Sequence, residues 1–502
     1  MDITSVALYG PAAAPFAGAV LAALLPRRTA AFTSVLAAIG VLASGIALAG
    51  HARGGTAVTG SLVRADALTA WLVIAVGAVA TVACWAGVHH LRDEARAGGL
   101  TAWSARRYLV LVQLFLTCMG AAVLAANVGV LWVAVEATTI VTAFLVGHRR
   151  TRASVEAAWK YVVLCSVGVG IAFLGTVCVS AAARATGAGG LRALDWVYLN
   201  EHAASLDPAL MRLAAGLVLL GFGTKAGLAP MHAWLPDAHS QAPAPVSALM
   251  SGVLLSVAFY AILRYKAIFD ACLGPGYART LLLVAAMASL ALAALLLIGQ
   301  RDYKRLLAYS SIEHMGLIAL GTAIGGRLAL AAVLLHILGH GLAKSVAFCG
   351  AGQLLHRVGS PLISAVRGAI TTAPATAGLF GLAVVALLGL PPFALFAAEL
   401  GQARAGFAAG YGWAVTIGFL LVLVAFSAIA RHGAGMLLGS PDPQTTVDTT
   451  AGHSSAAAAK PYRTGLSWVP LAVGLLAAAT LGIWLGPLRP VLDSAALIAA
   501  GH

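Results

Sequence analysis

Long apolar stretches follow one another along the whole chain, with short polar stretches between them. A stretch of about 20 apolar residues crosses the hydrocarbon of a bilayer as an α-helix. The pattern therefore predicts an all-α polytopic membrane protein with about 14 transmembrane helices. The predicted spans are residues 3–25, 31–50, 67–90, 107–126, 128–147, 157–182, 209–228, 244–264, 279–299, 304–325, 327–354, 373–407, 411–437 and 465–486.

The interruptions of this pattern indicate how the chain is organised. We expect three helices in residues 1–100, followed by two helical repeats in residues 101–265 and 275–437. Residues 438–464 are small, polar and proline-containing, which is typical of a flexible linker. Residues 465–502 then hold the last helix and a tail.

Composition and charge agree with a membrane protein. Hydrophobic residues make up 61% of the chain and charged residues only 10%, although the net charge is +14. Basic residues are more frequent after the odd-numbered spans, so the positive-inside rule places those ends in the cytoplasm and both termini on the outer side. The excess positive charge is a topology signal on this interpretation, and we expect no nucleic-acid partner.

Motifs for cofactors are missing from the sequence. The six cysteines form no CxxC pair, and neither a GxGxxG nor a GxxxxGK[ST] motif occurs. We therefore expect no metal, no iron–sulfur cluster and no nucleotide cofactor in this chain.

A run of polar and helix-breaking residues interrupts the apolar pattern after Phe222. Its sequence is Lys225-Ala-Gly-Leu-Ala-Pro230-Met-His232-Ala-Trp234-Leu-Pro236-Asp237-Ala-His239. A bilayer tolerates broken backbone only where it is buried in protein or lines a wet cavity, and a lysine at that depth is costly. The run predicts a broken helix on a proton or cation path. His232 and His239 either exchange protons at the cytoplasmic mouth or cap the broken helix.

Lysine and arginine occupy different positions. Lys160, Lys225 and Lys344 lie at or within predicted spans, whereas arginines lie almost wholly in loops or at span ends. A buried lysine can release its proton and arginine cannot, so this division favours proton transfer. For Lys160, at a helix end, snorkelling to the membrane surface is an equal alternative.

Glu136 lies in the middle of an apolar span and has no charged neighbour in its own helix. Such a carboxylate must be protonated or paired across helices. We expect Lys225 as its partner, in a pair that is either a proton switch or a static structural contact.

His336, His340 and Lys344 are spaced at i, i+4 and i+8, which places them on one face of one helix. Histidine titrates near neutral pH, so the spacing favours a proton relay over ordinary core histidines. A metal site would need further thiol or carboxylate ligands, which this run does not contain.

Glu399 follows Pro391 and Pro392, which should break the predicted span 373–407 midway. The chain would then have two broken helices, one with Lys225 and one with Glu399. Such a pair points to internal repeats, often inverted, with the transport path at the breaks. Glu313 and His314 add polar groups between the two halves.

Taken together, these motifs resemble the antiporter-like membrane subunits of respiratory complex I, Mrp-type cation/proton antiporters and group 4 hydrogenases. Within that family the chain is most similar to the hydrogenase-4 type. The resemblance is carried by Trp132 to Thr138, Lys225 to His239, Pro243 to Leu249, Lys304 to Ser311 and His336 to Lys344.

The resemblance implies two inverted five-helix repeats with broken helices 7 and 12. It implies that Glu136, Lys225, Lys344 and Glu399 carry a proton path, although Ser256 stands where several members have a lysine. We therefore expect a proton-translocating subunit of a redox complex in a bacterial inner membrane. Its partners would be other membrane subunits and a peripheral cytoplasmic redox arm.

Two other functions stay open at this stage. The chain could be a cation/proton antiporter or bicarbonate-uptake subunit of the same family, or a structural scaffold with inactive channels. Sodium prefers clustered carboxylates or carbonyls, and the few acids within the predicted spans mildly favour protons.

Overall fold

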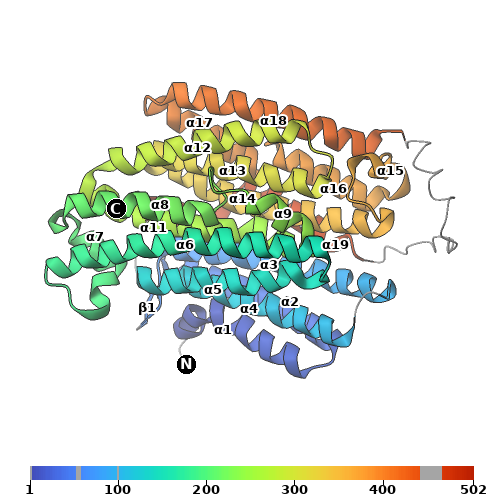
Figure 1. The fold of residues 1–502 in the computed structure, drawn as a ribbon, viewed down its shortest axis with the longest axis horizontal. Helices are drawn as coiled ribbons and strands as arrows, with labels where there is room; N and C mark the ends of the chain where they lie inside the picture. Colours follow the sequence, from blue (N-terminus) through green and yellow to red (C-terminus); the bar gives the residue numbers. More distant parts are fainter. Residues whose placement is uncertain (1–2, 53–57, 61, 99–100, 441–465, 502) are drawn as a thin grey trace.

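The computed structural model describes residues 3–52, 58–60, 62–98, 101–440 and 466–501. Its helices lie side by side along the longest axis of the molecule, with their loops gathered at the two ends (Figure 1). The N-terminal helices α1 and α2 lie along one side, and α17 and α18 lie along the opposite side.

The bounds of the helices follow the apolar stretches closely. In the first half these are α1 Ile3–Leu24, α2 Arg27–Ala52, α3 Ala67–Arg96, α4 Ala102–Leu124, α5 Val128–Val146, α6 Arg152–Ala185, α7 Trp196–Glu201, α8 Pro208–Lys225, α9 Trp234–Gln241, α10 Ala244–Leu249 and α11 Leu255–Leu273. In the second half they are α12 Pro275–Ile298, α13 Tyr303–Ile324, α14 Gly326–Val358, α15 Ala369–Thr372, α16 Pro374–Leu387, α17 Ala394–Ala408, α18 Gly412–Leu438, α19 Val469–Ile483 and α20 Arg489–Ala499. A π-helical turn, Met250–Leu254, joins α10 to α11.

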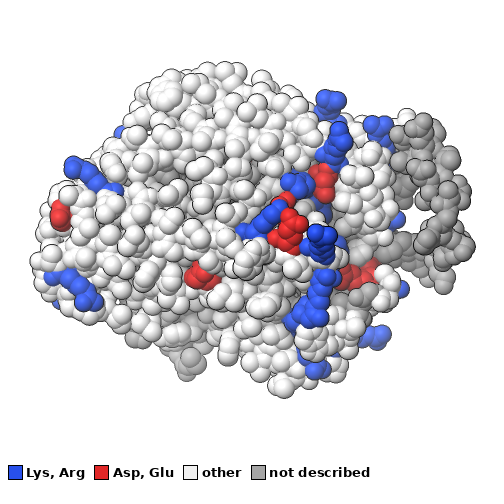
Figure 2. Space-filling view, viewed as in Figure 1, with Lys and Arg blue, Asp and Glu red and all other residues white. Residues whose placement is uncertain are grey.

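The chain is a multi-pass membrane protein. In the part that the structure describes, ten helices are long and apolar enough to cross a bilayer, or eleven if the bent pair α19 and α20 is one span. Large apolar side chains on the outer helices, such as Phe144, Leu174, Leu295 and Leu420, are exposed. Lipid covers such faces without cost. Figure 2 shows that the charged side chains on this face gather toward one end, and most of the rest is uncharged.

Two long elements form the centre of the bundle. The segment from α10 to α11 and the helix α14 are almost wholly buried, whereas α6, α12 and α18 expose much of their surface. Helix α14 packs against α3, α10, α13, α16, α17 and α19. The polar residues in the middle of α14, His336, His340 and Lys344, therefore face protein rather than lipid.

Polar side chains fix the starts of several helices by accepting backbone N–H bonds. Asp66 caps α3, Asn127 caps α5, and Asp207 caps α8. These groups satisfy N–H donors that a helix leaves unpaired in its first turn.

The structure departs from the predicted pattern in two places. The predicted span 244–264 continues to Leu273, so Lys266 lies inside the helix, buried and bonded to Asp270. Lys304, at the start of the predicted span 304–325, lies in α13 as expected and is buried. Residues 58–65 contain an unexpected antiparallel pair, β1 Val58–Thr59 with β2 Arg64–Ala65. The predicted linker falls largely on residues 441–465, outside the described part.

Candidate functional site

The predicted break after Lys225 is confirmed. Helix α8 ends at Lys225, and α9 begins only at Trp234. Gly227 has a φ of +79°, and a Cβ at this position would lie 2.5 Å from Leu235 Cδ1. A residue with a side chain would be strained in both respects, so glycine is required at the turn.

The backbone freed by this break is bonded inside the protein. The amide of Ala229 donates to Ser289 Oγ at 2.9 Å, and the Trp234 indole donates to the carbonyl of Thr224 at 2.9 Å. Lys304 Nζ donates to the carbonyls of Ser240 and Ala242 at 2.6 and 2.8 Å, at the end of α9. The broken helix therefore meets the requirement that backbone polar groups at membrane depth be satisfied.

Lys225 is fully buried, and its bonding partners among the described residues are both hydroxyl groups. Its Nζ donates to Thr139 Oγ1 on α5 and to the Tyr161 hydroxyl on α6, both at 2.7 Å. The Tyr161 ring also lies beneath the amine, 4.8 Å from Nζ to the ring centroid. A hydroxyl can either accept or donate a hydrogen bond, so this site can bind the lysine with or without its proton.

Glu136 reaches Lys225 through Thr139, and the direct ion pair expected from the sequence does not form. Thr139 Oγ1 donates to Glu136 Oε2 at 3.3 Å while accepting from Lys225. Ser166 Oγ donates to the other carboxylate oxygen at 2.7 Å. The missed residues Thr139, Tyr161 and Ser166 could not be assigned from the sequence, because hydroxyl residues are common in membrane helices.

In the second half, α14 places His336, His340 and Lys344 on one buried face, as their spacing predicted. Lys344 Nζ donates to the Leu307 carbonyl at 2.6 Å and to Ser310 Oγ. Neither ring nitrogen of His340 has a hydrogen-bond partner within the described residues. In the part of the chain that the structure describes, both Lys225 and Lys344 are thus buried with no carboxylate bonded to the amine.

A third histidine completes this cluster. His314 of α13 lies between the other two, with its ring centroid 5.2 Å from that of His336 and 4.9 Å from that of His340. The Gln402 side-chain amide nitrogen lies 3.2 Å from His336 Nδ1, and His336 Nε2 lies 3.1 Å from His314 Nδ1, so both ring nitrogens of His336 are within hydrogen-bond distance of a partner. The sequence indicated His314 only as a polar residue beside Glu313 and did not assign it to the proton path.

Glu399 lies against the second broken helix. Helix α16 ends at Leu387 and α17 begins at Ala394, so the chain breaks around Pro391 and Pro392 as predicted. A Cβ on Gly389 would lie 2.3 Å from Glu399 Oε2. Because Gly389 has no side chain, the Glu399 carboxylate can occupy this position. Glu313 is also buried, and its Oε2 is unbonded among the described residues.

The sequence of the His336 to Lys344 run lacks the carboxylate that a metal site would need, but the folded cluster contains one. Ligand atoms of His314, His336 and Glu399 all lie within 4.8 Å of one another. The sequence argument against a metal considered only one helix, whereas these residues come from α13, α14 and α17.

The remaining predicted residues take different positions. His239 is fully buried on α9, with Trp234 and Phe348 each 5.9 Å away between ring centroids. His232 is half-buried in the break. Lys160 lies apart from the buried groups, with its amine 2.7 Å from Glu156 and 3.2 Å from Asp237.

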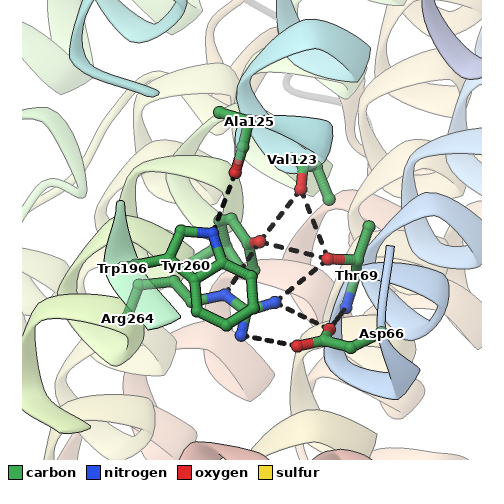
Figure 3. Close-up of polar contacts among 7 residues, drawn as sticks. All are labelled: Asp66, Thr69, Val123, Ala125, Trp196, Tyr260 and Arg264. Carbon is green, nitrogen blue, oxygen red and sulfur yellow. Dashed lines mark hydrogen bonds and ion pairs between the residues drawn. The ribbon is translucent and has the colours of Figure 1, made fainter. Parts of the chain in front are cut away.

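A separate buried cluster joins the start of α3 to the middle of α11 (Figure 3). Arg264 donates to both Asp66 oxygens at 2.7 Å, to Thr69 Oγ1 at 3.0 Å and to the Tyr260 hydroxyl at 2.9 Å. Its guanidinium lies 4.2 Å from the Trp196 ring centroid. Burial opposes ionisation of Asp66, but the charge and bonds of Arg264 hold its pKa below the ordinary value. The sequence did not predict this pair.

Comparison with known proteins identifies the family. A family model described as NADH:quinone oxidoreductase/Mrp antiporter, TM, matches residues 125–425. The chain belongs to this family. The matched region begins before α5 and ends within α18, so it contains both broken helices and both buried lysines.

Individual relatives match part of their own length. A hydrogenase-4 component F homolog of Methylacidiphilum infernorum is 41% identical over 310 residues, which cover 62% of this chain and 65% of that protein. NADH-quinone oxidoreductase subunit N of Desulforudis audaxviator is 36% identical over 244 residues, covering 47% of this chain and 48% of that protein. The chain thus spans less than two thirds of either relative.

Solved structures match the fold over its whole length. A chain of the Mrp complex from Dietzia sp. DQ12-45-1b superposes with a TM-score of 0.84 at 24% identity, covering 100% of this chain and 98% of that one. The two folds are alike from end to end.

Proposed function

We propose that this family member moves protons across the membrane along its buried glutamate, lysine and histidine residues. The observation that carries the proposal is the bonding of Lys225 and Lys344. Each amine is fully buried, bonded to hydroxyl or carbonyl groups, and not in an ion pair among the described residues. A lysine held only to keep a charge in place would gain more from a carboxylate.

The proposed path has two parts. In the first, Glu136 and Lys225 exchange protons through Thr139, which is bonded to both. In the second, Lys344 and the three neighbouring histidines connect toward Glu399, and each neutral imidazole can accept a proton on one nitrogen and release one from the other. His239 stands between the two parts, since α9 contacts both α6 and α13. We assign Glu313 to the second part, and we place His232 and Lys160 outside both parts of the path.

The proposed topology has 14 spans. The ten long helices and the α19–α20 pair are joined by α8, α13 and the broken pair α16–α17. We propose that residues 101–265 and 275–437 form two inverted five-helix repeats with broken helices 7 and 12. Both termini then lie on the outer side of a bacterial inner membrane.

The partners we propose are other membrane subunits and a peripheral redox arm that supplies the driving electron transfer. The relatives named as hydrogenase-4 and NADH-quinone oxidoreductase components support a complex of that kind. The family description also includes Mrp antiporters, so cation/proton antiport is the second candidate. Co-purification of iron–sulfur or nickel–iron subunits would favour the redox complex, and antiport by the chain without them would favour the second.

The test of proton transfer compares three variants in the purified complex, reconstituted into vesicles. Lys225→Ala and Glu136→Ala should assemble normally but lose most proton flux. Lys160→Ala should keep nearly all of it, because that lysine is exposed and ion-paired at the surface. Wild-type flux in both of the first two variants would refute the proposal.

A further inference from the structure

Two histidines and a glutamate meet at one end of the bundle, apart from the residues assigned to proton transfer. His90 and Glu94 are four residues apart on α3, and His356 lies in the last turn of α14. His356 Nε2 is 3.0 Å from His90 Nδ1, and His90 Nε2 is 3.3 Å from Glu94 Oε1. One ligand atom from each residue lies within 4.8 Å of the other two.

We propose that His90, Glu94 and His356 bind a divalent transition-metal ion of the Zn²⁺ type. Two imidazoles and one carboxylate are a donor set that zinc uses in proteins, with a fourth position left for water. Metal–ligand bonds of about 2.1 Å in a tetrahedral site place donor atoms about 3.4 Å apart. An ion can use only one His90 nitrogen, and with one ligand atom from each residue the donor atoms lie within 4.8 Å of one another. Side-chain rotations that bring these three atoms about an ångström or so closer would close the site.

The site is open to the surrounding solution on one side. A cavity of about 510 Å³ is lined by Glu94 and His356 together with Trp103, Arg107 and Arg149. A hydrated ion could therefore reach two of the three ligands directly. On the inner side, a much smaller cavity of about 10 Å³ is lined by His90, His356, Cys349 and Gln353. It has room for about one water molecule.

Positive charge around the site sets a limit on its affinity. Arg149 Nη2 lies 3.4 Å from Glu94 Oε1, and Arg107 and Arg150 line the same cavity. A bound cation must compete with Arg149 for the glutamate and is repelled by all three guanidinium groups. Removing the Arg149 charge should therefore tighten metal binding, because Arg149 both contacts the glutamate ligand and repels the cation.

The position of the site suggests what a bound ion would do. It would tie the end of α3 to the end of α14, and α14 carries His336, His340 and Lys344. It would also lie between the open cavity and the small inner one. We infer that the ion inhibits proton movement, and this second step rests on the function proposed above.

Binding is tested on the purified full-length protein with Zn²⁺ itself, by calorimetry and X-ray absorption. Wild type should bind one ion per chain with imidazole ligands, and His356→Gln and His90→Gln should each weaken binding by at least about tenfold. Arg149→Gln should bind more tightly. His89→Ala, which changes the adjacent histidine outside the three donors, should bind like wild type.

The outcomes separate the site from the function. Absence of Zn²⁺ binding to wild type, or equal binding by wild type and both glutamine variants, would overturn the site. If Zn²⁺ binds as expected, it should inhibit proton flux in wild-type vesicles and require a higher concentration in His356→Gln. Binding without any such inhibition would overturn the inhibitory role while leaving the metal site established.

Discussion

Two regions of this molecule bury a cation, and they hold it in opposite ways. Arg264 is bonded to both oxygens of Asp66, to two hydroxyl groups and against two aromatic rings (Figure 3). Lys225 is bonded to the hydroxyls of Thr139 and Tyr161, with no carboxylate in direct contact. The first arrangement fixes one charge state, because every strong contact is ionic or charge-assisted. The second is compatible with two charge states.

The difference distinguishes buried charges that stabilise the fold from buried charges that can act in proton transfer. The Arg264 cluster ties α3 and α11 to carbonyls near the end of α4, through Tyr260 and Trp196. It is therefore a structural joint. The sites of Lys225 and Lys344 contribute less to rigidity and leave the amine free to change partners.

The largest expected effect is on stability and comes from Asp66→Asn. This change leaves the Arg264 charge buried without its carboxylate, which should cost about 3–5 kcal/mol of unfolding free energy. Denaturation of the detergent-solubilised protein measures it. Asp493→Asn, which removes an exposed ion pair with Arg327, is the control and should cost less than about 1 kcal/mol.

The same variant gives a pH dependence with a defined sign. The folded-state pKa of Asp66 lies below its ordinary value of 3.8, so its stabilising contribution is present above that pH. The contribution is lost as the pH falls through the folded-state pKa. The stability difference between wild type and Asp66→Asn should shrink in that acidic range, and a constant difference would contradict the assignment.

A smaller loss of stability is expected from Arg264→Lys. Lysine keeps the charge but cannot reproduce the planar, bidentate contact with Asp66, so we expect a loss of about 1–3 kcal/mol. Proton flux by the molecules that remain folded should be unchanged. A flux defect without a stability defect would mean that this pair belongs to the transport path and that the contrast drawn here is wrong.

The smallest expected effect is on flux and comes from Thr139→Val. The change removes the hydroxyl between Lys225 and Glu136, and one hydrogen bond of about 0.5–1.5 kcal/mol corresponds to a reduction of about twofold to tenfold. Thr138→Val is a matched control, since the Thr138 hydroxyl bonds only to its own helix. Equal flux in the two variants would remove Thr139 from the path.

Much of this arrangement could be predicted from the sequence, because the signals were local. Apolar stretches located the helices, and prolines beside Lys225 and before Glu399 located both breaks. What could not be predicted depends on residues distant in the chain. Asp66 and Arg264 are 198 positions apart, and nothing near either one indicates the other. Likewise, Gln402 meets His336 only because α17 packs on α14.

The packing of a helix, and not its bounds along the chain, decides whether a lysine on it is buried. Lys160 lies within its predicted span and within α6, yet it forms ion pairs at the surface. Lys304, the first residue of the predicted span 304–325, is buried beneath α9. Lysine position along the chain is a weak guide until the packing of its helix is known.

The most direct test of the central claim is proton flux in vesicles containing the reconstituted complex with Lys225→Arg or Lys344→Arg. Arginine keeps the positive charge but does not release its proton at any physiological pH. We predict that each variant assembles and loses flux by at least about tenfold. Wild-type flux in either assembled variant would contradict the claim that the corresponding lysine gives up a proton during transport.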